Sequence, residues 1–182
     1  MNSQQIKEIL LSEIHEVSIN YEKYCNNPKR DFSRKRKLPF ELMLKNIIGM
    51  GSKSITNELI DIFQAFGEMP SASAFVQQRT KIKPAALKAV FDGFMSRILA
   101  SADKMRILAV DGSDTQIETN PKDKMSHIPT SIDKKSFNLL HLNALYDLEE
   151  HVYTDAIIQA AKSQNEHGAL NEMVDRSEIP KA

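Results

Sequence analysis

The stretch Met105-Arg106-Ile107-Leu108-Ala109-Val110-Asp111-Gly112-Ser113-Asp114 decides the fold of the second half of the chain. An apolar run of strand length leads directly into an aspartate and a glycine, a pattern typical of a buried strand that delivers a carboxylate to the edge of a sheet. If the strand alternates, Ile107, Ala109 and Asp111 share one face. Asp-Gly-Ser after a strand is most often a plain turn, because Asp hydrogen-bonds its own backbone and Gly accepts a positive φ. The residues alone therefore leave Asp111 either as a turn residue or as a catalytic or metal-binding carboxylate.

Two more strands and a helix are predicted downstream. Residues 137–146 form a nearly continuous apolar strand, 147–150 a hairpin turn, and 152–159 the returning strand. Helical spacing resumes from Asn165 through Val174. The polar stretch 118–136 predicts a long loop, which either lies over a substrate or is a plain surface loop.

Upstream of residue 100 the apolar spacing predicts helices alone. We expect one helix over about 3–24, one that begins near Pro39 and ends at Gly49 or Gly51, and one capped by Ser52 or Ser54 that ends at Gly67. A short helix follows Ser71 or Ser73, and a longer one begins at Pro84. Periodicity changes between 99 and 104, so the sequence predicts an α+β protein with a helical domain over 1–100 and a second domain over 101–182.

Composition restricts the class of protein. The chain has 182 residues, 41% of them hydrophobic, which suffices for a buried core. One cysteine, Cys25, excludes an internal disulfide and is expected to be a plain thiol. No stretch is apolar enough for a membrane span and the N-terminus lacks a signal-peptide pattern, so we expect a cytoplasmic protein with no membrane partner.

The zero formal net charge conceals an asymmetry between the two halves. Residues 1–100 carry 15 Lys and Arg against 10 Asp and Glu, a net of +5, whereas residues 101–182 carry 9 against 14, a net of −5. The two halves are therefore expected to have different partners or tasks.

A basic run is the strongest binding signal in the first half. Six cations fall within nine residues, and they are Lys29, Arg30, Arg34, Lys35, Arg36 and Lys37. Such a run suits a phosphate backbone, although a solvated loop has the same composition. Beyond it, Gln77, Gln78 and Arg79 are predicted to lie outward at the end of a short helix, and Lys81 lies where the next helix opens. Gln pairs with adenine and Arg with guanine, so this unit has the chemistry of a groove-reading element.

Several segments together resemble bacterial insertion-sequence transposases of the DDE type, close to the insertion sequence 4 family. The resemblance rests on Val110-Asp111-Gly112-Ser113, on residues 137–147 and 153–159, on Asn165-Glu166 and on Met173-Val174-Asp175-Arg176. It extends upstream to residues 32–40 and 73–79, and so covers most of the chain.

The resemblance implies a ribonuclease H-like catalytic domain that begins with three antiparallel strands and a helix. It makes Asp111 the first catalytic acid and a ligand of Mg²⁺. It also implies that double-stranded DNA at transposon ends is bound by Arg34, Lys35, Arg36, Lys37, Gln77, Gln78, Arg79 and Lys81. The second and third carboxylates of the family are expected beyond Ala182, so we expect a truncated, catalytically incomplete transposase, associated with the bacterial nucleoid through DNA.

Other acids within the chain are poor replacements for the missing carboxylates. Asp114 is at most an outer-shell group, Asp147 reads as a turn residue, and Asp155 is expected to face alongside Tyr153 and Ile157. None of the five histidines shows metal-ligand spacing.

Two other interpretations of the whole chain stay open. One is a non-enzymatic DNA-binding or inhibitory short form that acts with a second copy or with full-length transposase. The other is a helical domain joined to an unrelated sheet, with no role on DNA.

Overall fold

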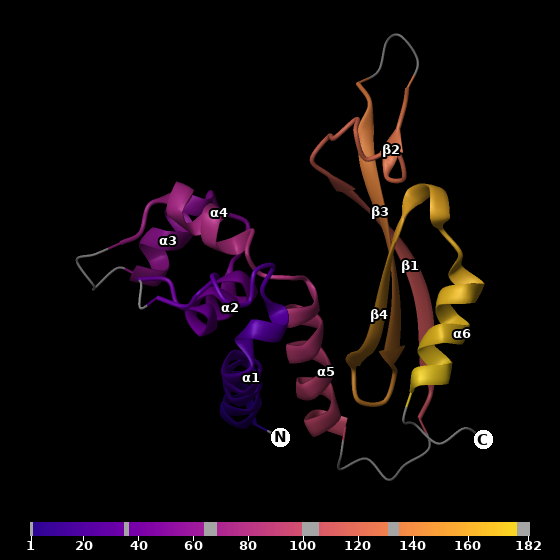
Figure 1. Ribbon diagram of the computed structural model, residues 1–182. Helices are drawn as coiled ribbons and strands as arrows, with labels where there is room; N and C mark the ends of the chain where they lie inside the picture. The colour runs from indigo at the N-terminus through magenta and orange to yellow at the C-terminus, as the bar shows by residue number, and fades with distance from the viewer. Residues whose placement is uncertain (1, 35–36, 64–68, 100–105, 131–134, 178–182) are drawn as a thin grey trace. The chain divides into compact units, whose positions relative to one another are not determined.

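The computed structural model describes residues 2–34, 37–63, 69–99, 106–130 and 135–177, and it divides into two compact units. The helical unit comprises Met1–Ala102 and the strand unit Asp103–Ala182, a division close to the predicted boundary at residue 100. The predicted α+β class is confirmed (Figure 1). No helix in the described part of the chain is long and apolar enough to cross a membrane.

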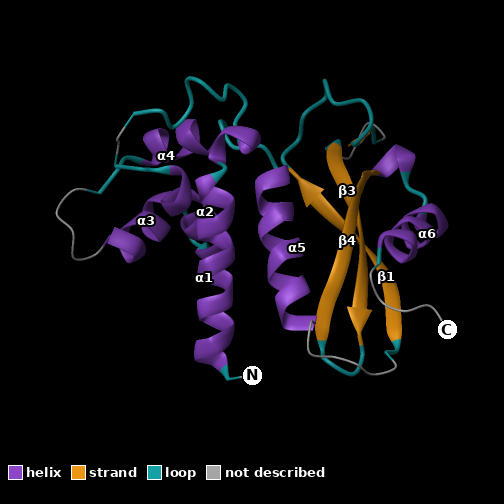
Figure 2. Cartoon of the chain, turned by 60° about the horizontal axis from the view of Figure 1, so that its bottom comes forward, coloured by secondary structure: helices purple, strands orange, loops and turns teal. Residues whose placement is uncertain are grey.

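The helical unit contains five α-helices within its described residues, and Figure 2 shows them as purple ribbons. They are α1 (Ser3–Ile19), α2 (Phe40–Gly49), α3 (Ile55–Phe63), α4 (Ala72–Arg79) and α5 (Ala85–Leu99), with a 3₁₀ turn, η1 (Tyr21–Tyr24), after α1. The first helix is thus shorter than predicted, because its backbone tightens into η1 beyond Asn20. The predicted end of α3 at Gly67 lies outside the described residues.

Side-chain caps explain where several helices begin. The Asn2 side chain accepts from the Gln5 amide, and the Gln5 side chain accepts from the Asn2 amide, which forms a capping box. Ser71 Oγ accepts from the Ala74 amide at the start of α4. Each cap satisfies a backbone donor that a helix start would otherwise leave unpaired.

Two apolar clusters stabilise the helical unit. The first lies among α1, α2 and α5 and is formed by Ile14, Val17, Cys25, Phe40, Leu44, Ala86 and Val90. The second joins α2, α3 and α4 through Leu38, Met43, Leu59 and Phe75. Because α2 contributes to both clusters, it links the α1–α5 pair to the α3–α4 pair.

The strand unit is an antiparallel sheet with one helix packed on it. Its strands are β1 (Leu108–Ile117), β2 (His127–Ile128), β3 (Phe137–Asp147) and β4 (Val152–Ala160), followed by η2 (Ala161–Ser163) and α6 (Glu166–Arg176). β3 is central: β1 pairs along one edge, and β2 and β4 pair with different parts of the other. β3 and β4 agree with the predicted strands, β1 extends further than predicted, and the short β2 lies in the predicted loop 118–136.

β1 continues through the Asp-Gly-Ser sequence, so the interpretation of Asp111 as a turn residue is wrong. Asp111 lies within the strand, opposite Ala144 of β3, and the ladder extends beyond it to Ile117. The sequence pattern predicted that Asp111 lies at the end of a strand, and this prediction is wrong.

The two faces of the sheet differ in their side chains. One face is covered by α6, whose Ala169 and Met173 are buried, and this face also buries His141, Asn143 and Asp147. The other face carries Asp111. A bulge between Leu145 and Tyr146 places Tyr153 opposite Tyr146 and Asp155 opposite Leu145. Tyr153 and Asp155 therefore face opposite sides, which corrects the prediction that they lie together.

Candidate functional site

The loop after η1 is tied to the turn between α4 and α5, although more than fifty residues separate them. The Asn26 amide donates to the carbonyl of Lys81 at 3.0 Å, and Asn26 Nδ2 donates to the carbonyl of Thr80 at 2.8 Å. The Lys83 amide donates to the carbonyl of Tyr24 at 2.8 Å. These bonds bring the basic run and the predicted groove-reading unit side by side.

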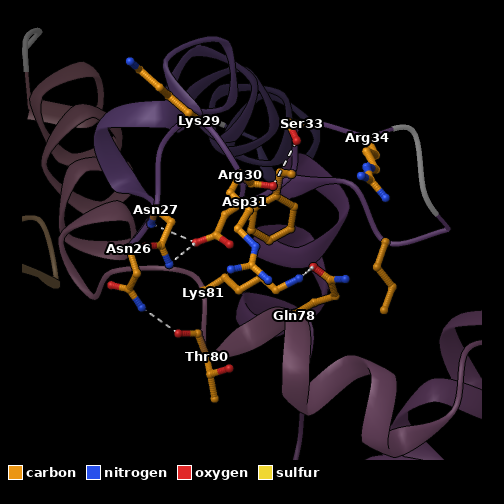
Figure 3. A pocket seen from close by; sticks show the side chains of 12 residues that line it. Asn26, Asn27, Lys29, Arg30, Asp31, Ser33, Arg34, Gln78, Thr80 and Lys81 are labelled. Carbon is orange, nitrogen blue, oxygen red and sulfur yellow. Dashed lines mark hydrogen bonds between the residues drawn. The ribbon is translucent and has the colours of Figure 1, made fainter.

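A concave pocket with a volume of about 640 Å³, here called the basic hollow, forms where the two segments meet (Figure 3). Its lining comes from the loop after η1, from the end of α4 and from the turn that follows α4. It comprises Asn26, Asn27, Lys29, Arg30, Asp31, Phe32, Ser33, Arg34, Leu38, Gln78, Thr80 and Lys81. Four of these side chains are cationic and one is anionic, which gives the lining a formal net charge of +3.

The loop is folded tightly around Asp31, which is buried. The Asp31 amide donates to the carbonyl of Asn27 at 2.8 Å, and the Asn27 amide donates back to Asp31 Oδ2 at 2.9 Å. The next residue, Phe32, has φ of 57°, which is strained for a bulky side chain. Its ring packs edge-on against Phe40, with the centroids 5.2 Å apart, so the apolar cluster stabilises this conformation.

The cations of the hollow lie mainly at its exposed margin. Lys29, Arg30 and Arg34 are exposed, whereas Lys81 is half-buried and donates through Nζ to Gln78 Oε1 at 3.0 Å. Like charges gathered around a concave surface attract an anion more strongly than the same charges dispersed over a convex one. A phosphate group is the common biological anion that several lysines and arginines bind together.

The residues predicted to bind DNA are only partly brought together. Arg34, Gln78 and Lys81 line the basic hollow, and Lys37 and Gln78 line a neighbouring hollow of about 460 Å³. Gln77 and Arg79 are exposed on α4 and line neither. Lys35 and Arg36 lie outside the described residues. The outward orientation predicted for Gln78 is wrong, because helical spacing turns it toward the unit, where it is buried.

Sequence reasoning did not single out Asn26, Asn27 and Asp31 as site residues. The sequence indicates the turn but not the contacts that make these residues part of a site. Asn-Asn-Pro and Asp31 mark a turn, but the hydrogen bonds to residues 80 and 81 join distant segments.

Asp111 has an exposed side chain, and its Oδ1 accepts from the Gly112 amide at 2.9 Å. On the same face of the sheet its neighbours are Ala109 and Ser113 along β1 and Ala144 across the strands. No group of three or more His, Cys, Asp or Glu side chains in the described ranges could hold a metal ion. The residues present therefore do not form the set of oxygen ligands that Mg²⁺ requires.

On the opposite face, a polar cluster that the sequence did not reveal surrounds Gly112. His141 is buried, its Nδ1 lies 2.8 Å from Asp114 Oδ1, and its Nε2 lies 3.3 Å from Glu166 Oε1. A Cβ atom at Gly112 would lie 2.6 Å from His141 Nε2, so glycine makes room for the ring. The cluster joins β1, β3 and the first turn of α6.

Cys25 is not a candidate nucleophile. Its side chain is fully buried, and burial, assisted by the nearby Asp31 carboxylate, raises the pKa of the thiol to about 11. A thiol with such a pKa carries very little of the reactive thiolate near neutral pH.

We expect Cys25 to resist a thiol-specific reagent at pH 8, with a rate at least about 100-fold below that of the urea-unfolded chain, because the thiolate fraction falls tenfold per pKa unit. The rate of reaction is measured by the absorbance of the product released from the reagent. The raised pKa of Cys25 also makes the free energy of unfolding depend on pH: its contribution is fully present below the unfolded pKa of about 8.5 and is lost as the pH rises toward 11. Equal rates for folded and unfolded chain would contradict the burial of Cys25.

No protein-family model, curated protein or solved structure matches this chain.

Proposed function

We propose that the helical unit binds double-stranded DNA through the basic hollow, and that the chain serves as the DNA-binding part of a DDE-type transposase. The observation that carries this proposal is the meeting of two separately predicted segments, the basic run and the α4–α5 turn, around one cationic concave surface. The resemblance to insertion-sequence transposases adds support from the sequence. Transposon ends are the expected DNA partner.

The chemistry around the hollow suits a duplex. Arg30 and Arg34 are exposed at its margin and are free of ion pairs within the described residues, so they suit phosphate oxygens. Gln77 and Arg79 project from α4 close to Gln78, and both residue types make bidentate contacts with base edges. Phosphate contacts would set the position of the protein, and α4 would supply base readout.

The strand unit supports a ribonuclease H-like assignment. Three long antiparallel strands in the order β1-β3-β4 are followed by a helix, and the first strand carries Asp111. β1 pairs only with β3 in the described part of the sheet, so its other edge is available to a parallel neighbour. In the transposases that this sequence resembles, such a neighbour carries the second catalytic carboxylate.

DNA cleavage and strand transfer by the complete enzyme would use Mg²⁺, which the described residues do not fit. Asp111 would contribute one carboxylate, and further ligands would come from elsewhere, in a longer chain or in another transposase subunit. Binding of DNA by the helical unit does not depend on that site.

A non-enzymatic role is the second candidate. It is favoured by the surroundings of Asp111, whose described neighbours on the sheet face are alanine and serine rather than a second acid. In that role the chain would occupy transposon ends or pair with a full-length transposase and inhibit it.

We expect the chain to bind a labelled duplex of about 30 bp with an affinity that falls steeply between about 50 and 200 mM salt. Arg30→Ala and Arg34→Ala should each reduce the slope of log affinity against log salt by about 0.9 if each side chain neutralises one phosphate. Fluorescence anisotropy measures both quantities. Lys7→Ala, which removes an exposed cation of α1 outside the hollow, is the matched control and should leave the slope unchanged.

Nicking assays separate the two candidates. Salt-dependent binding without Mg²⁺-dependent nicking favours the non-enzymatic role. Nicking that Asp111→Asn abolishes favours a transposase whose site is completed within an assembly. Failure to bind duplex DNA at low salt overturns both.

A further inference from the structure

We propose that the basic hollow takes one unpaired nucleotide of a DNA strand, with guanine as the preferred base. This inference rests on the proposed function and deepens it, because it assigns to the hollow a ligand more specific than a duplex backbone. A fully paired duplex would contact only the margin of the hollow, and its interior would stay unused.

The size of the hollow is the first reason. Its volume of about 640 Å³ falls within the range of pockets that enclose small molecules, about 300–1,000 Å³. A nucleotide fits such a space, whereas backbone phosphates of an intact duplex need only exposed cations. The tight loop around Asp31 supplies most of the lining residues.

The interior chemistry is the second reason, because it does not suit a phosphate alone. Asp31 lies in the lining with 5% of its surface exposed, and a carboxylate repels a phosphate. Both hydrogen bonds to this carboxylate come from Asn27 and reach Oδ2. Oδ1 accepts no hydrogen bond from another described residue, so one acceptor is available in the lining of the hollow.

A base edge with N–H donors satisfies an acceptor of this kind. An ionised carboxylate only accepts hydrogen bonds, and the remaining oxygen, Oδ1, has two lone pairs that can accept from two adjacent N–H groups. Guanine offers two adjacent donors on its Watson–Crick edge, from N1 and the amino group, whereas thymine offers only one. This edge is accessible only in an unpaired base.

The wall and margin of the hollow suit the rest of the nucleotide. Phe32 contributes an aromatic ring to the lining, and the same ring packs edge-on against Phe40. Aromatic rings stack with bases. Lys29 and Arg34 lie at the edges of the group in Figure 3, where the phosphate of the same nucleotide would be neutralised.

The test compares three labelled duplexes of identical sequence, one fully paired, one with a single unpaired guanine and one with a single unpaired thymine. At about 150 mM salt we expect the unpaired guanine to bind about tenfold more tightly than the paired duplex, as base stacking and a carboxylate contact together allow. The unpaired thymine should fall between them. These ratios are measured on the unchanged protein and do not depend on the folding of a variant.

Asp31→Asn tests the assigned acceptor. Asparagine retains an oxygen for the Asn27 amide but replaces the other oxygen with a donor, so the ratio between unpaired guanine and paired duplex should fall to about one. The matched control is Glu58→Gln, which alters a buried carboxylate of α3 that bonds the Gly51 and Lys53 amides away from the hollow. It should retain the tenfold preference.

Each other outcome overturns a defined part of the proposal. Equal affinities for all three duplexes, with salt-dependent binding retained, would overturn the nucleotide site and leave the proposed function standing. Absence of binding to any duplex would overturn both. Displacement of the DNA by free guanosine monophosphate, at a concentration no higher than that of the DNA with the unpaired guanine, would be a different result. It would overturn the assignment to DNA, because the hollow would then be a site for a free nucleotide.

Discussion

Phe75→Ala is expected to lower the free energy of unfolding of the helical unit by about 3–5 kcal/mol. Phe75 is fully buried on α4 and packs in the cluster formed with Leu38, Met43 and Leu59. Removing its ring leaves a cavity among α2, α3 and α4, and these helices would have to move together to fill it. Because a domain of this size is stable by only about 5–15 kcal/mol, the loss is a large fraction of the total.

The same substitution should weaken DNA binding without touching the DNA. Phe75 and Gln78 lie one turn apart on α4, so the ring anchors the helix that forms one wall of the basic hollow. Urea unfolding, followed by hydrogen exchange of the α4 amides, measures the stability, and anisotropy measures the binding. Phe75→Leu is the matched control and should cost less than about 1.5 kcal/mol. A loss below about 1 kcal/mol for Phe75→Ala would contradict the packing described for this cluster.

The elements of the fold were largely predictable because local chemistry determines them. Ser71 and Asn165 begin α4 and α6 through side-chain caps, and the apolar spacing predicted a helix where α3 lies. The sequence did not predict the length of β1, because Asp-Gly-Ser has turn chemistry. Ladder bonds from Asp111, Gly112 and Ser113 to β3 override that local preference.

The candidate site was less predictable, since it depends on contacts between segments far apart in the sequence. The cations of the basic run were evident from composition alone. The loop from Asn26 to Asp31 forms one side of the hollow only because the carbonyls of Thr80 and Lys81 accept hydrogen bonds from Asn26. Gln78 follows the buried Phe75 by three residues, so helical spacing indicates its burial, but its place in the lining of the hollow depends on the distant loop.

The ion pair between Arg106 and Asp147 is the second feature whose disruption should have a large effect. Arg106 Nη1 lies 3.4 Å from Asp147 Oδ2, and both side chains are buried, with exposed fractions of 5% and 0%. Asp147 Oδ1 also accepts from the amides of Glu149 and Glu150, which form the turn between β3 and β4. The pair therefore fastens the start of β1, the strand that carries Asp111, to the β3–β4 turn.

Arg106→Met is expected to destabilise the strand unit by about 3–5 kcal/mol, because it leaves a buried carboxylate without its cation. The double variant Arg106→Met with Asp147→Asn should be more stable than Arg106→Met alone, since asparagine keeps the oxygen that accepts from Glu149 and removes the uncompensated charge. Hydrogen exchange of the β3 amides confines the measurement to this unit. Arg97→Met is the matched control: it breaks an ion pair with Glu13 in which Arg97 is 47% exposed, and it should cost at most about 1 kcal/mol. If the double variant were no more stable than Arg106→Met, the loss would come from the packing of the arginine side chain, and the buried charge would not be what holds β1 to the turn.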